Sequence, residues 1–222
     1  MKKIILSALM LASGLSFAQV DLSSTRFGLT VGGNYSRVTN AHNPSGPRYG
    51  IQAGALALIP IDNNDQFYLQ PEIVFYAAGE SGKDKNAQGS VGYDAKYYNN
   101  YISIPVYFKA YFSEAESEFF GMIGPRFNLL VSQKVENPSK RYYVAEQLEE
   151  YPGVNGKASP FNFAVGAGLG FSYKRQLELA LRYDLGVSNT YKGLMTESGS
   201  DPNIEKRKTE HVVSVGLSYI FE

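Results

Sequence analysis

The sequence contains no cysteine, and its 222 residues include only two histidines, His42 and His211. Without cysteine the chain has no disulfide, no thiolate ligand for a metal, no thiol nucleophile and no cysteine that could carry a lipid anchor. Basic and acidic side chains are balanced at 21 each, so the composition provides no basic surface of the kind that binds nucleic acid. No nucleic-acid partner is therefore expected.

Long apolar runs are also missing beyond the N-terminus. A membrane-spanning helix needs about 20 consecutive apolar residues, and the rest of the chain contains no run of that length. The strands of a membrane barrel alternate apolar and polar residues, so a barrel has the average hydropathy of a soluble protein. The sequence is rich in tyrosine (17) and phenylalanine (13), which membrane barrels place in girdles at the two interfaces.

Residues 1–18 have the three parts of a secretory signal peptide. Two lysines precede an apolar stretch, and the small residues Ser16 and Ala18 stand at the positions that a signal peptidase reads. The apolar stretch is too short to span a membrane as a retained anchor. We therefore expect export and cleavage, and a single domain over residues 19–222.

The stretch from Phe161 to Ser188 alternates strictly between two kinds of side chain on both sides of a turn at 174–176. Odd positions are apolar or aromatic, whereas even positions are small, polar or charged, which indicates a strand with two unlike faces. The alternation lasts for about a dozen residues per strand. Strands of soluble sheets usually have about five or six residues, whereas a strand that crosses a membrane needs about 9–11.

The same alternation predicts an all-β fold with eight strands. The connections between them alternate, with short turns at 60–66, 112–118 and 174–176 and longer loops at 39–48, 77–95, 132–159 and 189–208. This indicates an eight-stranded antiparallel up-and-down transmembrane β-barrel with short periplasmic turns and longer extracellular loops. The predicted strands are Thr25–Val38, Tyr49–Ile59, Phe67–Tyr76, Lys96–Tyr111, Phe119–Val131, Phe161–Tyr173, Leu177–Ser188 and Thr209–Phe221.

Two prolines interrupt predicted strands. Proline has no N–H to give to a strand ladder, so Pro71 predicts a bulge or a local gap, and Pro105 predicts a bulge. Glycines at 166, 168 and 170 stand on the inward face. We interpret them as making room for bulky residues across the lumen, such as Arg126 or Tyr76, or as relieving strand curvature.

Charged residues gather on the predicted inward face. The interior of an eight-stranded barrel is just wide enough for side chains, and charges buried there must be paired. We therefore interpret this set as a structural network of ion pairs that fills the lumen. An active site, or a narrow pore for small solutes, is the alternative. The residues of the lumen network are Glu72, Lys109, Arg126, Glu178, Arg182 and Asp184.

Motifs for catalysis, metals and cofactors are weak. His42 and His211 are both expected near the outer rim, but no spacing supports a catalytic triad, so we predict no enzymatic activity. Residues 62–65 resemble the start of a calcium loop, yet Phe67 and Ile73 occupy the positions that need glycine and glutamate. No metal site and no cofactor are predicted. A soluble lipocalin-like barrel would need an apolar interior, the inverse of the hairpin's pattern.

The long loops contain tyrosines. Such residues on a rigid scaffold make plausible binding surfaces, although a membrane girdle and ordinary loop packing explain them equally well. The tyrosines in or beside the loops are Tyr93, Tyr97, Tyr98, Tyr142, Tyr143, Tyr151 and Tyr191.

Four segments in order along the chain resemble strands of the PorT-like outer-membrane β-barrel family of Bacteroidetes. The resemblance implies a small eight-stranded barrel of the OmpX/OmpA type in the outer membrane, inserted by the barrel-assembly machinery and surrounded by lipid. One member of that family takes part in protein secretion, so secretion or envelope proteins are further expected partners. A terminal aromatic is usual, whereas here Glu222 follows Phe221. The segments are LQPEI (69–73), NNYISIPVYFKAY (99–111), GMIGPRFNLLVS (121–132) and LELALRYDLGVSN (177–189).

Overall fold

The structure is a computed structural model that describes residues 24–41, 46–81, 95–137, 158–191 and 206–221. The predicted signal peptide, the centres of the four long loops and His42 lie outside these residues. The prediction of a single domain over residues 19–222 stays a prediction.

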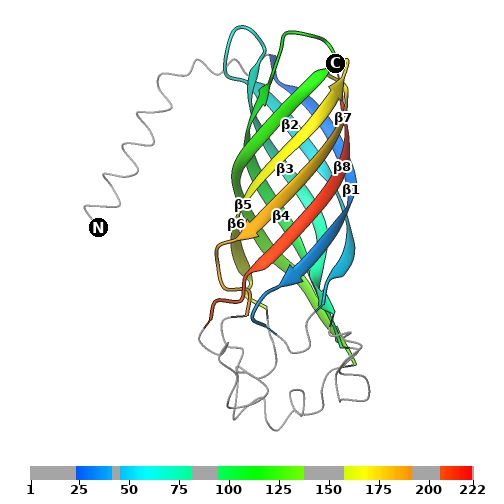
Figure 1. Cartoon of the computed structure of the whole chain (residues 1–222), viewed down its shortest axis with the longest axis vertical. Helices are drawn as coiled ribbons and strands as arrows, with labels where there is room; N and C mark the ends of the chain where they lie inside the picture. The colour runs from blue at the N-terminus through cyan, green and yellow to red at the C-terminus, as the bar shows by residue number, and fades with distance from the viewer. Residues whose placement is uncertain (1–23, 42–45, 82–94, 138–157, 192–205, 222) are drawn as a thin grey trace, which may run out of the picture.

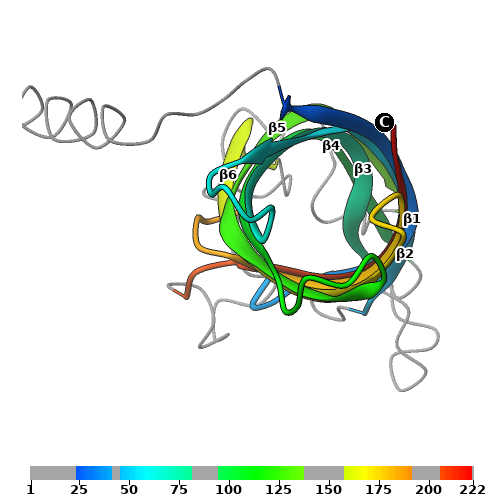
Figure 2. The ribbon, with the colours of Figure 1, turned by 90° about the horizontal axis from the view of Figure 1, so that it is seen from above.

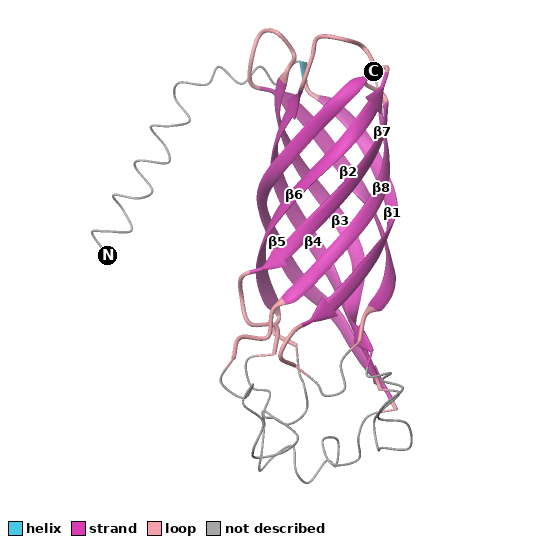
Figure 3. Ribbon diagram, viewed as in Figure 1, coloured by secondary structure: helices cyan, strands magenta, loops and turns pink. Residues whose placement is uncertain are grey.

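Eight antiparallel strands form one closed barrel, in which each strand pairs with the next and β1 pairs with β8 (Figures 1 and 2). The described residues contain no α-helix. Their one helical residue is Ser24, in a 3₁₀ turn (the small cyan segment in Figure 3), and no helix among them is long and apolar enough to cross a membrane. The fold predicted from the alternation is confirmed. The strands are β1 (Arg26–Val38), β2 (Arg48–Pro60), β3 (Phe67–Ser81), β4 (Lys96–Tyr111), β5 (Glu118–Glu136), β6 (Phe161–Tyr173), β7 (Leu177–Gly186) and β8 (Glu210–Ile220).

The apolar face of each strand points outward. In β7, for example, the residues from Leu177 to Leu185 alternate between exposed and buried at every position. Outward leucines, isoleucines and valines make a continuous apolar wall, whereas the buried positions hold most of the charged and polar side chains of the strands. The arrangement is the inverse of a soluble barrel and fits a barrel surrounded by lipid.

Outward aromatic residues form two girdles, one near the short turns and one near the long loops. Phe27 and Tyr35 on β1 are eight residues apart, as are Phe67 and Phe75 on β3. Eight residues cover roughly 26 Å along a strand, or about 20 Å of height at the usual tilt. This is close to the apolar band of outer-membrane barrels, about 25 Å tall. The spacing repeats in Phe119 and Phe127 on β5 and in Phe163 and Phe171 on β6.

Two strands are longer than the sequence predicted. β3 continues to Ser81 and β5 to Glu136, five residues beyond the predicted ends, because both pair with the first residues of β4. A register shift between Asn100 and Tyr101 accompanies the extension. Residues 77–81 and 132–136 are therefore strand, not loop. The extensions stand past the loop-side girdle. Residues 77–80 of β3 are all buried, and the exposed residues of the β5 extension, Ser132 and Lys134, are polar, so the alternation that marks a lipid-facing strand is lost in both.

The two prolines do not shift the strand register. Pairing between β2 and β3 lapses opposite Pro71 and resumes in the same register, which confirms the local gap. Pro105 stays opposite Arg126, and the next two positions are unpaired without an extra residue. The predicted bulge at Pro105 is therefore wrong. The strands tolerate a missing N–H by losing ladder bonds locally, and the only register shift in this pair lies at Asn100 and Tyr101.

Candidate functional site

All six residues of the predicted lumen network are buried inside the barrel, with exposed fractions of 6% or less. They form three ion pairs, and each pair includes one residue of β7. The alternation of β7 directs Glu178, Arg182 and Asp184 inward at successive heights, and each meets a side chain from another part of the ring. The pairs are Glu178 with Lys109, Arg182 with Glu72, and Asp184 with Arg126.

The central pair joins opposite sides of the lumen. Arg182 donates from both terminal nitrogens to the two carboxylate oxygens of Glu72, at 2.8 Å each. Gln70 donates a further hydrogen bond of 2.6 Å to Glu72. The guanidinium carbon of Arg182 lies 5.1 Å from the ring centre of Tyr107. A bidentate pair of this kind positions both groups, because two parallel bonds set the orientation of the planes.

The pair nearest the short turns has aromatic neighbours. Lys109 Nζ lies 2.5 Å from a carboxylate oxygen of Glu178, and the hydroxyl of Tyr111 donates a 2.6 Å hydrogen bond to the other oxygen. The same ammonium lies 4.1 Å from the ring centre of Phe120. Each charge is thus compensated and packed, which offsets the cost of removing it from water.

The pair nearest the long loops is the most highly connected. Arg126 donates to Asp184 through a terminal nitrogen and to Ser103 through Nε at 2.7 Å, and its guanidinium lies 4.2 Å from the ring centre of Tyr76. Tyr107 donates to the other oxygen of Asp184 at 3.3 Å. Through Tyr107 this pair also contacts Arg182, so the central and loop-side layers are linked.

Two further groups extend the network to both ends, and the sequence analysis missed them. Near the loops, Tyr76 donates to the buried Glu210 at 2.9 Å and stacks on Tyr101. Glu210 lies within the predicted strand Thr209–Phe221, and continuing the inward positions back from Ser214 through Val212 reaches it. At the turns, Arg175 binds Glu118 through Nε and a terminal nitrogen at 3.1 and 2.6 Å. Glu118 was assigned to an acidic turn, but it is the first residue of β5 and is buried.

Arg175 also closes the turn-side end of the lumen. Its guanidinium lies 4.8 Å from the ring centre of Tyr111 and donates 2.7 Å to the carbonyl of Asp65 in another turn. Partial burial acts to lower the pKa of Arg175, but the hydrogen bonds and charge of Glu118 outweigh burial and raise the pKa above its usual value. The guanidinium therefore stays charged and paired at any ordinary pH.

The inward glycines of β6 do make room for bulky side chains, although not for Arg126 or Tyr76. A methyl group at position 166 would meet the ring of Tyr107, at 168 it would meet Met122, and at 170 it would meet the ring of Phe120. Phe120 and Met122 come from β5, which pairs with β6, whereas Tyr107 comes from β4, one strand further round the ring.

The structure gives no catalytic arrangement to His211. Its Nδ1 lies 2.7 Å from the hydroxyl of Tyr183 and its Nε2 lies 3.3 Å from the hydroxyl of Thr209, so both ring nitrogens have partners at the outer wall. His42 lies outside the described residues, so its expected place near the outer rim stays a prediction. No cluster of metal-binding side chains occurs among the residues that the structure describes.

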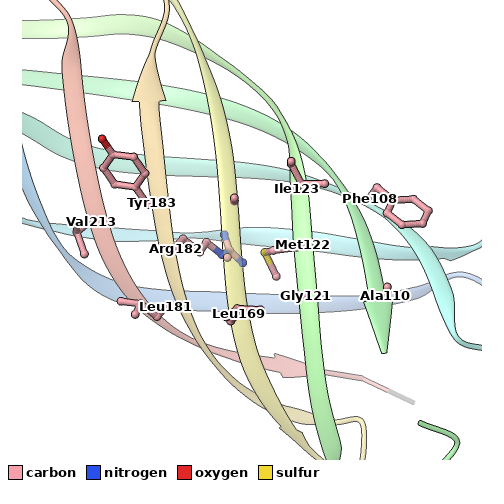
Figure 4. A pocket seen from close by; sticks show the side chains of 12 residues that line it. Phe108, Ala110, Gly121, Met122, Ile123, Leu169, Leu181, Arg182, Tyr183 and Val213 are labelled. Atoms are coloured by element: carbon pink, nitrogen blue, oxygen red, sulfur yellow. The ribbon is translucent and has the colours of Figure 1, made fainter. Parts of the chain in front are cut away.

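The hollows of the molecule differ in place and character. Beside Arg126, Asp184 and Glu210 the lumen leaves a cavity of about 10 Å³, which is about the room that one water molecule occupies. A much larger hollow of about 700 Å³ lies across β4 to β8, where the outward residues include Phe108, Ile123 and Tyr183 (Figure 4). Most of its lining belongs to the apolar outer wall, and the inward side chains of Met122 and Arg182 also line it.

Solved structures with a similar fold share little sequence with this chain. They include Ail, the attachment invasion locus protein of Yersinia pestis, with 12% identity and a TM-score of 0.45 over 88% of this chain and 98% of Ail. Neisserial surface protein A has 12% identity and a TM-score of 0.46 over 88% and 97% of the two chains. The outer membrane enzyme PagL has 11% identity and a TM-score of 0.48 over 87% and 98%.

Among curated proteins, none matches the sequence. The family model of the outer membrane protein beta-barrel domain matches residues 17–192, which is most of the chain and includes the first seven strands. The closed barrel, its apolar outer wall and its charged interior agree with this match. The chain therefore belongs to the outer membrane protein beta-barrel domain family.

Proposed function

We propose that this protein is a closed, non-conducting outer-membrane barrel that anchors its long loops as a binding surface outside the cell. The observation that carries the proposal is the set of three buried ion pairs at three heights of the lumen. Each pair is flanked by an aromatic ring, so side chains and not water fill the cross-section. The lumen network then has a structural role.

A narrow pore for small solutes is less consistent with the packing. Ions that cross a barrel need a continuous wet path, and small barrels are filled by side chains. Glu72 and Arg182 are bonded across the lumen between β3 and β7, which are four strands apart in a ring of eight. The cavity beside Arg126 and Glu210, about 10 Å³, is too small to form part of such a path.

We also propose that the barrel has no enzymatic activity and no cofactor. The lumen acids and bases are paired with one another, and His211 is bonded through both ring nitrogens to Tyr183 and Thr209. A general base must be able to reach a proton on a substrate, and among the described residues no acid–histidine–nucleophile arrangement offers that reach.

The role that fits this architecture is anchoring and interaction. We propose membership of the PorT-like group of Bacteroidetes, with a signal peptide at residues 1–18, insertion by the barrel-assembly machinery, and secretion or envelope proteins as partners. Four segments within β3, β4, β5 and β7 support the assignment by resemblance. Affinity capture from detergent-solubilised envelopes tests it, and we expect an envelope or secretion protein to be retained. Recovery of the barrel without any specific partner would contradict this role.

Single-channel recording in a planar bilayer tests the closed lumen. The purified, refolded protein should give no steady conductance. A stable open current would overturn the proposal and favour the narrow pore. Because folded barrels migrate faster than unfolded ones on gels unless they are heated, the same sample should be checked by that shift before recording.

A further inference from the structure

The exposed charges of the described residues lie only at the two ends of the barrel, and the two ends have opposite sign. At the turn end the fully exposed charged residues are three acids, Asp65, Glu114 and Glu116, and one base, Lys174. At the loop end the described ranges have one partly exposed acid, Glu136, which is paired with Lys134, and five exposed basic residues. The basic residues are Arg37, Lys96, Lys134, Lys206 and Arg207.

One part of the loop end is shaped as a notch. A hollow of about 280 Å³ lies where β2 begins, at Arg48, beside the end of β3 at Ser81 and the start of β4 at Lys96. A bridge between Gly46 and Ser81, and a 2.9 Å hydrogen bond from Ser81 to the carbonyl of Pro47, hold the walls together. The notch is lined by Pro47, Arg48, Tyr49, Glu80, Ser81, Lys96 and Tyr98.

The guanidinium of Arg48 is held in a fixed position within the notch. Its central carbon lies 4.4 Å from the ring centre of Tyr98, and one terminal nitrogen donates to the carbonyl of Ala78. The ring of Tyr98 is in turn held by a 2.9 Å hydrogen bond from its hydroxyl to Glu136. A guanidinium stacked on an aromatic face keeps its remaining N–H donors directed outward in its own plane, which suits a phosphate.

The charge of the notch also favours an anion. Arg48 and Lys96 contribute two positive charges, and the fully buried Glu80 contributes one negative charge, which leaves one positive charge in excess. Glu136 lies opposite Lys96 on β5 and is paired with Lys134 at 2.8 Å, so this neighbouring pair adds no net charge to the notch.

The position of the notch identifies the source of the anion. Tyr49 lines the notch and packs edge-on against Tyr35 in the loop-side girdle, so the notch lies immediately beyond the apolar wall. Aromatic girdles mark the interface between the acyl chains and the headgroups of a membrane. A lipid whose acyl chains lie against Ile51 and Ile73 would therefore bring its headgroup phosphate to Arg48 and Lys96.

We propose that this notch binds the phosphate of an outer-leaflet lipid, with Arg48 and Lys96 as the anion-binding residues. The phosphate accepts hydrogen bonds from the stacked guanidinium, Lys96 adds a second positive charge, and Tyr49 contacts the upper part of the acyl chains. The inference does not depend on whether the lumen conducts.

Lipid retention by the full mature barrel tests the site. Phosphatidic acid serves as the phosphate-bearing probe, phosphatidylcholine serves as the comparison lipid, and native mass spectrometry measures the lipid that stays bound. The wild type should retain phosphatidic acid in preference to phosphatidylcholine. The R48Q/K96Q variant should retain about thirtyfold less, given that each of the two basic residues near a membrane surface contributes about 1 kcal/mol and that about 1.4 kcal/mol corresponds to a factor of ten.

Lys174→Gln is the matched control, because it removes one exposed positive charge at the opposite end. It should bind phosphatidic acid as the wild type does. If R48Q/K96Q does not fold, Lys96→Gln alone, at an exposed position, should still show a several-fold loss. Equal retention by wild type and R48Q/K96Q, or an equal loss in Lys174→Gln, would overturn the site. Displacement of the lipid by an equal concentration of inorganic phosphate would overturn its assignment to a membrane lipid.

Discussion

Arg182 and Glu72 are 110 residues apart in sequence and are joined by two 2.8 Å hydrogen bonds across the lumen. They stand on β7 and β3, which are opposite strands of the ring. Both side chains are buried, so neither charge can return to water when the other is lost. The pair therefore couples the stability of β3 to that of β7, because loss of either side chain leaves a buried charge on the other strand.

Replacing Glu72 by alanine should destabilise the barrel strongly. The change leaves the guanidinium of Arg182 buried without its carboxylate, and such a loss costs about 3–5 kcal/mol. Urea unfolding of the barrel in lipid vesicles measures the free energy of unfolding. The double variant Glu72→Leu, Arg182→Met is the control and should recover most of that loss, because it removes both charges and keeps apolar volume. A Glu72→Ala variant whose free energy of unfolding falls by less than about 1 kcal/mol would contradict the coupling between the two residues.

Replacing Gly170 by alanine should also destabilise the barrel. The added methyl group would meet the ring of Phe120 and would lie 2.6 Å from the carbonyl oxygen of Leu179 on the adjacent strand. Overpacking of this kind costs about 1–3 kcal/mol. Gly33→Ala is the control, because the nearest atom there is 3.9 Å away, and alanine in a strand is favoured over glycine by about 0.5–1 kcal/mol. Equal unfolding midpoints for the two variants would show that the lumen has spare room.

The sequence predicted most of the fold because the lipid-facing wall imposes period-two alternation. Phe27 to Tyr35 and Leu177 to Leu185 show the pattern without a break, and their outward faces were assigned correctly. The ends of β3 and β5 were missed for the same reason. Beyond the girdle no lipid imposes an apolar face, so a polar strand and a polar loop have similar sequences.

Alternation also predicts which charges point inward, but it does not predict their partners. Arg126 and Arg182 both occupy inward positions of their strands. Nothing in the sequence around either arginine shows whether Asp184 or Glu72 is its partner. Strand tilt and the register around the ring decide the pairing. The same limit explains why the wrong residues were predicted to cover the β6 glycines, and why Glu118 was missed.

The turn between β6 and β7 offers a stability test with opposite outcomes at two adjacent residues. Lys174 and Arg175 both have φ of 51°, and the N–H of Gln176 donates to the carbonyl of Tyr173 at 3.1 Å. Two positive φ values in a two-residue turn favour the sequence Asn-Gly. Lys174→Asn should raise the free energy of unfolding by up to about 1 kcal/mol, because asparagine tolerates this conformation better.

Arg175→Gly should instead lower the free energy of unfolding, although glycine suits the turn. The change removes two hydrogen bonds to Glu118, one to the carbonyl of Asp65, and the contact with Tyr111. Glu118 is then left buried without its cation, at a cost of roughly 1–3 kcal/mol for an unsatisfied group. Urea titration of both variants beside the wild type gives the comparison. A more stable Arg175→Gly variant would mean that the turn conformation outweighs the closure of the lumen at this end.

The orientation of the barrel can be tested cleanly because the chain contains no cysteine. Asn63 and Lys206 are exposed at opposite ends, so Asn63→Cys and Lys206→Cys each introduce a single accessible thiol. Barrels of this kind keep short turns in the periplasm and longer loops outside, and the exposed basic residues in the described part of the loop end suit an anionic membrane surface. A large, impermeant maleimide should therefore label Lys206→Cys on intact cells, and should label Asn63→Cys only after the outer membrane is permeabilised. Equal labelling of both variants on intact cells would contradict this orientation. It would also contradict the assignment of the notch to the outer leaflet.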